Sequence, residues 1–230
     1  MTTIASNLQQ VRARIATACA ANGRSVEDVA FLAVSKTFGP EAIRAAHAAG
    51  QRAFGENYIQ EAVEKMALLA DLALEWHCVG PIQSNKTRLV AVHFDWAHTV
   101  DRLKIAERLS AQRPPGRAPL DVCIQVNIDG GPAKSGVAPG ATLALAQAVA
   151  ALPRLRLRGL MAIPEPSADF ESAYAVHRRT RALFDQLNAA GLGLDTLSLG
   201  MSADLEAAIA AGSTLVRVGS AIFGTRPSKA

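Results

Sequence analysis

Short apolar runs alternate with helical patterns along almost the whole chain, and this alternation constrains the fold more than any other feature. The runs are rich in β-prone residues and are bounded by glycine or proline, which is typical of buried strands. Between them, apolar residues recur at helical spacing. Strands are therefore predicted over residues 29–35, 52–55, 75–79, 96–100, 121–128, 155–163, 196–199 and 215–218.

A helix is predicted after every strand except the last. Strands that alternate with helices form parallel βαβ units. Eight such strands in 230 residues predict an α/β fold, a single (β/α)8 TIM-type barrel domain over residues 1–230. An open doubly wound sheet is the alternative. The predicted helices cover residues 41–49, 58–72, 85–92, 102–112, 142–151, 170–190 and 203–211.

An extra N-terminal helix precedes the first strand and would pack outside or beneath the barrel. Ser6 is expected to cap it, with Gln9 completing a capping box, and Gly23 is expected to end it. Residues 113–119 are rich in proline and look like a domain linker. An excursion between a helix and a strand explains them equally well.

Charge and cysteine usage argue against several classes of protein. The net charge is +4, but no basic run is interleaved with aromatic residues, so we expect no nucleic-acid partner. The cysteines Cys19, Cys78 and Cys123 fit neither a disulfide framework nor a zinc motif, and the histidines lack metal-ligand spacing. We find no signal peptide and no run of membrane-spanning length. A cytoplasmic protein without a membrane or metal is expected.

Lys36 directly follows the first predicted strand and precedes the breaker pair Gly39-Pro40. In a barrel, ligand groups lie just after the strands, at their carboxyl ends. There an ammonium group can be desolvated and its pKa lowered, which makes a lysine a Schiff-base nucleophile. The position alone also fits an ordinary solvated lysine.

Small and hydroxyl residues follow the last two predicted strands, with Ser198, Gly200 and Ser202 after the seventh and Gly219 and Ser220 after the eighth. Glycines let a backbone approach an anion, and free amides at a helix start bind phosphate. Barrels often hold phosphate after these two strands. Ser202 is explained equally well as the N-cap of the following helix.

Arg217 ends the last apolar strand, where a charge must find a partner in an ion pair or a ligand ring. Asn57 fits a cap for the helix at Tyr58, and His77 fits a core histidine. One ligand reconciles the lysine, the arginine and the phosphate-like loops, namely pyridoxal 5′-phosphate. Its aldehyde would meet Lys36, and Arg217 would keep the pyridine nitrogen unprotonated because an arginine rarely gives up its proton.

Motifs over nearly the whole chain resemble the pyridoxal-phosphate homeostasis proteins, the YggS/PROSC family, which look like the barrel domain of alanine racemase standing alone. The third and last motifs are the most specific. The motifs are Ala33–Lys36, Phe54–Glu61, Trp76–Lys86, Gln125–Ile128, Arg158–Met161, Ser198–Ser202 and Arg217–Gly224.

The resemblance implies that Lys36 is the Schiff-base lysine, that Arg217 contacts the pyridine nitrogen, and that Asn57 and Met161 line the ring. It implies a binding and homeostasis protein that buffers pyridoxal phosphate or delivers it to dependent apoenzymes, without a well-established reaction. The phosphate would be surrounded by Ser198, Ser202, Gly219 and Ser220.

An amino-acid racemase is the alternative function. Alanine racemase draws its second base from an additional β domain, and we expect that domain to be absent because the chain ends at Ala230, soon after the last strand. A monomer is expected for the same reason. A third alternative is an aldolase-like barrel that uses Lys36 on another carbonyl phosphate.

Three positions depart from the family pattern. Cys78 stands where phenylalanine or methionine is usual, and Ser220 replaces a threonine but keeps a hydroxyl. The loop 129–136 lacks the acidic residues that usually precede its lysine, Lys134. No role is therefore assigned to that loop.

Overall fold

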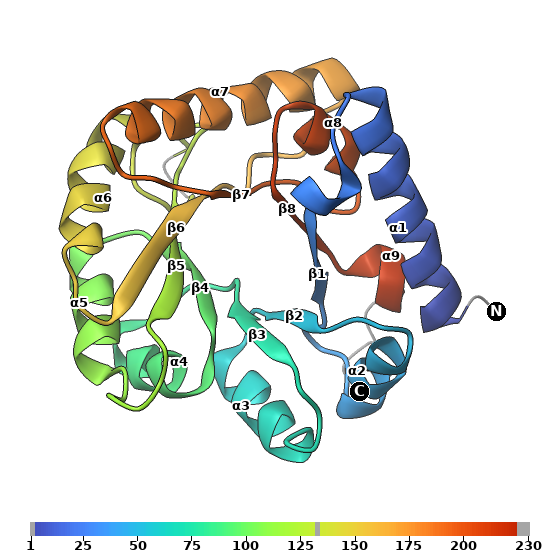
Figure 1. The fold of residues 1–230 in the computed structure, drawn as a ribbon, viewed down its shortest axis with the longest axis horizontal. Coiled ribbons are helices and arrows are strands. Elements are labelled where there is room, and N and C mark those ends of the chain that lie inside the picture. Colours follow the sequence, from blue (N-terminus) through green and yellow to red (C-terminus); the bar gives the residue numbers. More distant parts are fainter. Residues whose placement is uncertain (1–2, 132–133, 225–230) are drawn as a thin grey trace.

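The computed structural model describes residues 3–131 and 134–224. Eight parallel strands, paired in chain order, close into a barrel in which β1 pairs with β8 (Figure 1). The predicted (β/α)8 barrel is confirmed, and the open sheet is excluded. The strands are β1 (Ala30–Val34), β2 (Ala53–Glu56), β3 (Glu75–Cys78), β4 (Trp96–Val100), β5 (Leu120–Gln125), β6 (Leu155–Met161), β7 (Thr196–Ser198) and β8 (Leu215–Val218).

Helices surround the strands as an outer ring (Figure 1). A short helix, α9, follows β8, where none was predicted. Three 3-10 turns, η1 (Val26–Asp28), η2 (Ser84–Lys86) and η3 (Pro139–Ala141), precede β1, α4 and α6. The helices are α1 (Ile4–Ala21), α2 (Pro40–Ala48), α3 (Ile59–Leu68), α4 (Thr87–His93), α5 (Leu103–Gln112), α6 (Thr142–Ala150), α7 (Phe170–Ala189), α8 (Leu205–Ala210) and α9 (Ser220–Phe223).

The N-terminal helix α1 packs outside the barrel against α2, α8 and α9 (Figure 1). Its cap is Thr3, so the prediction of Ser6 as the cap was wrong. The Thr3 hydroxyl accepts from the Ser6 amide at 3.1 Å, and the Ser6 hydroxyl accepts from the Thr3 amide at 3.0 Å. Ser6 therefore completes the capping box from inside the helix. Gly23 follows the helix at φ 64°, as predicted for its end.

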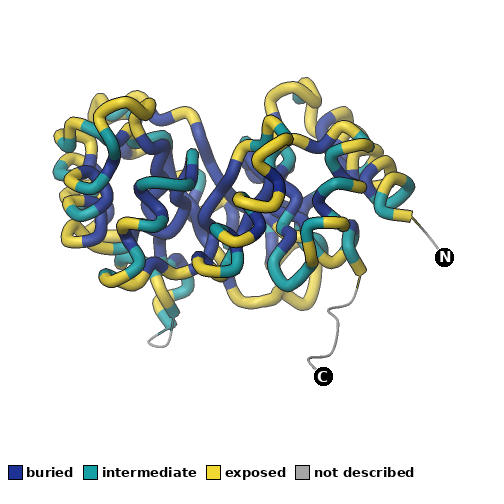
Figure 2. The backbone as a smooth tube through the Cα atoms, turned by 90° about the horizontal axis from the view of Figure 1, so that it is seen from below, coloured by how far each residue is buried: buried dark blue, intermediate teal, exposed yellow. Residues whose placement is uncertain are grey.

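Strand residues alternate between the barrel interior and the layer beneath the helices, as a two-residue period requires. Along β8, Val216 belongs to the large cluster under the helices, whereas Leu215 belongs to a small interior cluster. Figure 2 shows the buried residues concentrated in the strands and on the inward sides of the helices. The core therefore has two layers, and the inner one positions the candidate site.

The proline-rich segment 113–119 connects α5 to β5 within the barrel, so it is not a domain linker. Arg113 fastens it by donating from Nη1 to the carbonyls of Ala91 and Phe94. The three cysteines are buried and unpaired. Within the described residues, no helix combines the length and apolarity needed to cross a membrane.

Candidate functional site

A cavity of about 320 Å³ opens at the carboxyl ends of the strands. Apolar side chains form its walls. The sequence alone does not mark them as binding residues, because apolar residues are common throughout the chain. These wall residues are Val34, Phe38, Val79, Ile163 and Met201. Six of the eight predicted site residues line the same cavity, namely Lys36, Asn57, Ser202, Arg217, Gly219 and Ser220.

The turn that carries the half-buried Lys36 is held from both sides by helix α3. The amide of Thr37 donates to Glu61 Oε1 at 2.9 Å, and Lys65 Nζ donates to the carbonyl of Ser35 at 3.0 Å. Thr37 has φ 68° and is the one non-glycine residue in the described chain with positive φ. Such a conformation costs free energy and persists only where surrounding contacts impose it. The peptide groups that flank Lys36 are therefore fixed.

A buried ion cluster lies behind this turn. Lys65 Nζ contacts Glu56 Oε1 at 2.8 Å and Glu61 Oε1 at 2.6 Å, and the Ser35 hydroxyl donates to Glu56 at 2.7 Å. Burial raises the pKa of Glu56, and Lys65 and Ser35 offset part of that rise. The cluster joins the ends of β1 and β2 to α3, and so it supports the lysine turn.

Asn57 follows β2 and presents an unsatisfied acceptor. Its Oδ1 is buried, and within the described residues it has no hydrogen-bond partner. Capping does not explain Asn57, because Tyr58 occupies the N-cap of α3. The backbone of Gly80 packs against Asn57 so closely that a Cβ on Gly80 would lie 2.1 Å from the Asn57 carbonyl. A buried unpaired acceptor is costly, so a ligand donor here would lower the free energy of the complex.

Hydroxyl groups from two loops form another side of the cavity. Ser202 Oγ and Ser220 Oγ lie 3.3 Å apart. Asp204, not Ser202, is the N-cap of α8, so capping does not account for Ser202. Gly219 is the N-cap of α9, and a Cβ there would lie 3.0 Å from the carbonyl of Val34. Hydroxyls beside the free amides of a helix start suit an anionic group.

Arg217 is 4% exposed and reaches the cavity from the last strand. Its Nη1 donates to the Ser198 carbonyl and hydroxyl, both at 2.6 Å, and its Nη2 donates to the Ala162 carbonyl at 3.0 Å. Among the described residues, no carboxylate lies within ion-pair distance of it. Burial lowers the pKa of Arg217 to about 10, so the group remains charged at neutral pH.

The other two predicted residues, Ser198 and Met161, do not line the cavity. Both are fully buried in the barrel, and Met161 packs with Trp96 and Cys123. They are the last residues of β6 and β7. Arg217 reaches the cavity because its side chain is long.

An adjoining hollow of about 230 Å³ extends the cavity toward Lys134. Lys134 Nζ lies 3.4 Å from Asp129 Oδ2 and 3.1 Å from Glu165 Oε1. Two positions of its loop, Pro132 and Ala133, lie outside the described residues. The hollow widens the space beside Asn57.

The site therefore joins an amine, a charged guanidinium, apolar walls and a hydroxyl-rich side. Such a set fits an anionic ligand that carries a flat ring and a carbonyl group. The carbonyl would suit the lysine, the ring would suit the apolar walls, and the anionic group would suit the hydroxyls.

Comparison with known proteins agrees with the fold described above. Residues 3–227 match the family described as alanine racemase, N-terminal domain. The pyridoxal phosphate homeostasis protein of Pseudomonas aeruginosa is 61% identical over 226 residues, which cover 98% of this chain and 97% of that protein.

Two solved structures extend the comparison. PipY from Synechococcus elongatus, solved with PLP bound, is 36% identical with a TM-score of 0.85, covering 96% of this chain and 100% of its own. Alanine racemase from Clostridium difficile is 15% identical with a TM-score of 0.75. It shares the fold, and the match covers 97% of this chain and 58% of the racemase. The chain therefore belongs to the alanine racemase N-terminal domain family and, within it, to the pyridoxal phosphate homeostasis proteins.

Proposed function

We propose that this protein binds pyridoxal 5′-phosphate in the cavity above the barrel and serves the homeostasis of that cofactor by buffering or delivering it. The observation that carries the proposal is the convergence of Lys36, Arg217 and the Ser202–Ser220 hydroxyl pair on one cavity. These groups come from distant parts of the chain. Their meeting at the carboxyl ends of the strands supports a ligand with an aldehyde, a ring and a phosphate.

The residues present fit pyridoxal phosphate in charge and in shape. Ser202, Ser220 and the backbone at Gly219 would hold the phosphate, and the apolar walls would hold the ring. The buried, unpartnered Oδ1 of Asn57 offers an acceptor to a polar group of the ligand. Ser198 and Met161 would act from beneath the ring, since neither lines the cavity.

Bound pyridoxal phosphate supplies an aldehyde that condenses reversibly with a primary amine. Lys36 is the amine that we assign to this role, and its turn is fixed by α3 before any ligand arrives. Arg217 would donate toward the ring nitrogen and, as a cation that keeps its proton, would leave that nitrogen unprotonated. This arrangement favours holding the cofactor over activating it.

The test is the visible absorption spectrum of the protein with added pyridoxal phosphate, followed by borohydride reduction and peptide mass spectrometry. We expect a cofactor band and a reduced adduct on the peptide that contains Lys36. The Lys36→Ala variant should lose both. Lys104→Ala, at an exposed position of α5, is the matched control and should retain both.

Each outcome decides the proposal. An adduct on another lysine would move the anchor away from Lys36. No band in the wild-type protein, together with binding of a sugar phosphate, would overturn the proposal in favour of an aldolase-like barrel. Exchange of the α-proton of an added amino acid at an enzymatic rate would instead identify an amino-acid racemase.

We also propose that the protein is a cytoplasmic monomer that passes the cofactor to dependent apoenzymes. Support comes from the reversible linkage expected at Lys36. Light scattering would give the mass in solution, and fractionation would give the location. Recovery of apoenzyme activity while a phosphatase removes free pyridoxal phosphate would support delivery, and no recovery would leave buffering alone.

A further inference from the structure

Hydrogen bonds run without a break through the barrel, from the end where the strands begin to Arg217 beside the cavity. Glu75 Oε1 lies 2.6 Å from His77 Nε2, and His77 Nδ1 lies 2.9 Å from His98 Nε2. His98 Nδ1 lies 3.0 Å from Ser198 Oγ, which accepts from Arg217 Nη1 at 2.6 Å. We call Glu75, His77, His98 and Ser198 the relay.

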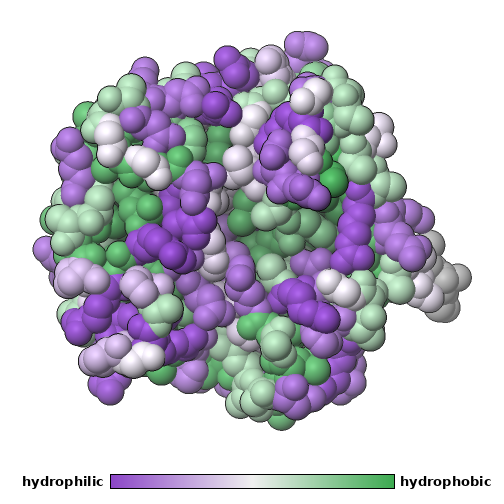
Figure 3. Space-filling view, in the orientation of Figure 1, coloured by the Kyte–Doolittle hydropathy of each residue, from purple (hydrophilic) through white to green (hydrophobic). Residues whose placement is uncertain are grey.

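The relay is closed to solvent except at its far end. His98 and Ser198 are 0% exposed, and His77 is 2% exposed, whereas the Glu75 side chain is 52% exposed. Glu75 and His77 line a hollow of about 160 Å³ at the mouth where the strands begin. Figure 3 looks onto this end of the molecule, where hydrophilic residues border an apolar depression. Solvent therefore meets the relay at Glu75.

The chemistry of the two ends sets the direction of every link. A guanidinium only donates, and an ionised carboxylate only accepts. Ser198 accepts from Arg217, and with one proton assigned to each imidazole ring its hydroxyl donates to His98 Nδ1. His98 Nε2–H then donates to His77 Nδ1, and His77 Nε2–H donates to Glu75. This assignment places one proton on each ring, at Nε2, and leaves no link unpaired.

The surroundings of His98 favour this arrangement. Burial above all, with the charge of Arg217 contributing, holds the pKa of His98 well below its ordinary value. The hydrogen bond from His77 lowers the pKa of Glu75, and the nearby Arg158 on β6 adds to that effect. The His77 ring stacks on Trp96, with centroids 5.3 Å apart and planes 9° apart.

Other charges also face this end of the relay. Arg158 is paired with Asp121 on β5 and with Asp195 before β7. Asp121 and Asp195 are engaged in these pairs, so Glu75 is the carboxylate that completes the relay.

We propose that the relay positions Arg217, so that Glu75 at the far end of the barrel helps to keep the guanidinium charged and aimed at the ligand cavity. Arg217 lacks a carboxylate partner within the described residues, and a buried cation needs compensation. Four aligned hydrogen bonds that end on a carboxylate provide it, because linked hydrogen bonds polarise one another. The effect on ligand binding rests on the proposed function, whereas the direction of the relay does not.

The first experiment measures the histidine tautomers by side-chain ¹⁵N NMR of the ligand-free protein at neutral pH. We expect His77 and His98 each to show a protonated Nε2 and a bare Nδ1. In Glu75→Gln, the His77 signals should shift toward a mixture of tautomers. Glu27→Gln, an exposed glutamate before β1, is the matched control and should leave them unchanged. A protonated Nδ1 on either histidine of the wild-type protein would overturn the relay.

The second experiment measures the dissociation constant for pyridoxal phosphate. Ser198→Ala removes the link next to Arg217, and we expect about tenfold weaker binding, equivalent to about 1.4 kcal/mol. Glu75→Gln should weaken binding by a smaller factor, about threefold, because an amide still accepts a hydrogen bond. Glu75→Gln changes an exposed side chain and should fold normally. It therefore provides the test if Ser198→Ala proves unstable.

The two proposals fail separately. Unchanged affinity in both variants, with a wild-type protein that binds, would overturn the positioning role and leave the proposed function intact. A wild-type protein that does not bind pyridoxal phosphate would overturn the proposed function, and with it the role of the relay in binding. The tautomers would still decide the direction of the relay.

Discussion

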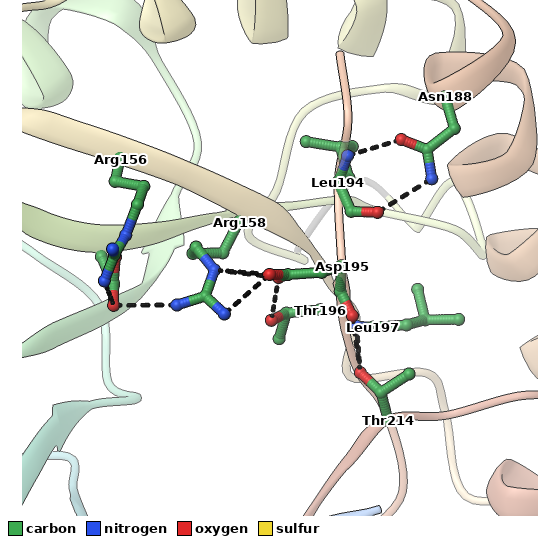
Figure 4. Close-up of polar contacts among 9 residues, drawn as sticks. Arg156, Arg158, Asn188, Leu194, Asp195, Thr196, Leu197 and Thr214 are labelled. Carbon is green, nitrogen blue, oxygen red and sulfur yellow. Dashed lines mark hydrogen bonds and ion pairs between the residues drawn. The ribbon is translucent and has the colours of Figure 1, made fainter. Parts of the chain in front are cut away.

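At the end where the strands begin, Arg158 lies between Asp121 and Asp195, while at the opposite end Arg217 has no carboxylate partner among the described residues. Figure 4 shows Arg158 beside Asp195, to which Thr196 also donates at 2.8 Å. At the first end, Arg158 is paired within the protein. The second leaves Arg217 to be completed by carbonyls, a hydroxyl and a ligand.

The two ends of the barrel therefore contribute differently to stability and to ligand binding. Groups that form ion pairs with one another stabilise the fold, and they have few hydrogen-bonding sites left for a ligand. A cation such as Arg217 and an unpaired acceptor such as Asn57 Oδ1 contribute less to folding and more to binding. Substitutions should therefore separate stability from affinity according to the end they affect. The ion cluster at Lys65 is the exception at the cavity end.

The largest effect is expected from Lys65→Met, which tests that exception. Lys65 is buried between Glu56 and Glu61, so its loss leaves Glu56 buried without a cation. Breaking a buried ion pair costs about 3–5 kcal/mol of unfolding free energy. Urea denaturation would measure this loss, and the double variant Glu56→Gln/Lys65→Met should recover most of it. A single variant as stable as the wild-type protein would contradict the assigned role of the cluster.

A smaller loss is expected from Asp121→Asn at the end where the strands begin. Asp121 is largely buried and pairs with both Arg156 and Arg158, but Arg156 is largely exposed, so we expect a loss of about 2–3 kcal/mol. Pyridoxal phosphate affinity should stay within about twofold of the wild-type value. Asp185→Asn, in an exposed pair with Arg181, is the control and should cost about 0.5 kcal/mol or less. If Asp121→Asn also lost affinity for pyridoxal phosphate, the proposed difference between the two ends would be contradicted.

The smallest effects are expected in the pH dependence of stability, where one carboxyl group from each end should act in opposite directions. Burial raises the pKa of Glu56. Its contribution is fully present below its ordinary pKa and is lost as the pH rises through the raised value. Burial opposes ionisation of Asp195, but hydrogen bonds from Arg158 and Thr196 outweigh it and lower its pKa. That contribution is present above the ordinary pKa and is lost as the pH falls through the lowered value.

Urea midpoints measured across the acidic range would check both signs. Glu56→Gln should remove a decline of stability with rising pH, and Asp195→Asn should remove a decline with falling pH. Identical pH profiles for the two variants would contradict the comparison of the ends.

The strands and most helices could be predicted because their signals are local. Apolar runs and helical spacing depend on neighbouring residues, and they determined the barrel. Cap choice was harder, since Thr3 with Ser6 and Ser6 with Gln9 both satisfy a capping pattern, and the chain adopts the former. The α9 helix was missed because its four residues are too few to show a period.

The site was predictable where a residue follows a strand and carries distinctive chemistry, as Lys36 and Arg217 do. Contacts between distant parts of the chain left no local pattern, so the Glu56–Lys65 cluster and the relay were not predicted. The placement of Met161 depends on a register shift between β5 and β6, at Val122 and Cys123. Such a shift changes which side chains face the interior, and residue periodicity does not report it.

The pairing of β1 with β8 has a consequence for how the protein matures. The cavity joins a turn made early in synthesis to loops made late, and α1 fastens them, because Asn7 donates to the Ile222 carbonyl at 2.8 Å and Arg14 donates to the Ser202 carbonyl at 3.0 Å. Contacts between such distant segments form late in folding. The ligand can therefore bind only after β1 and β8 have closed the barrel, and its binding energy would stabilise the barrel as one cooperative unit. Binding of the cofactor would then indicate that the barrel of a newly synthesised chain is complete.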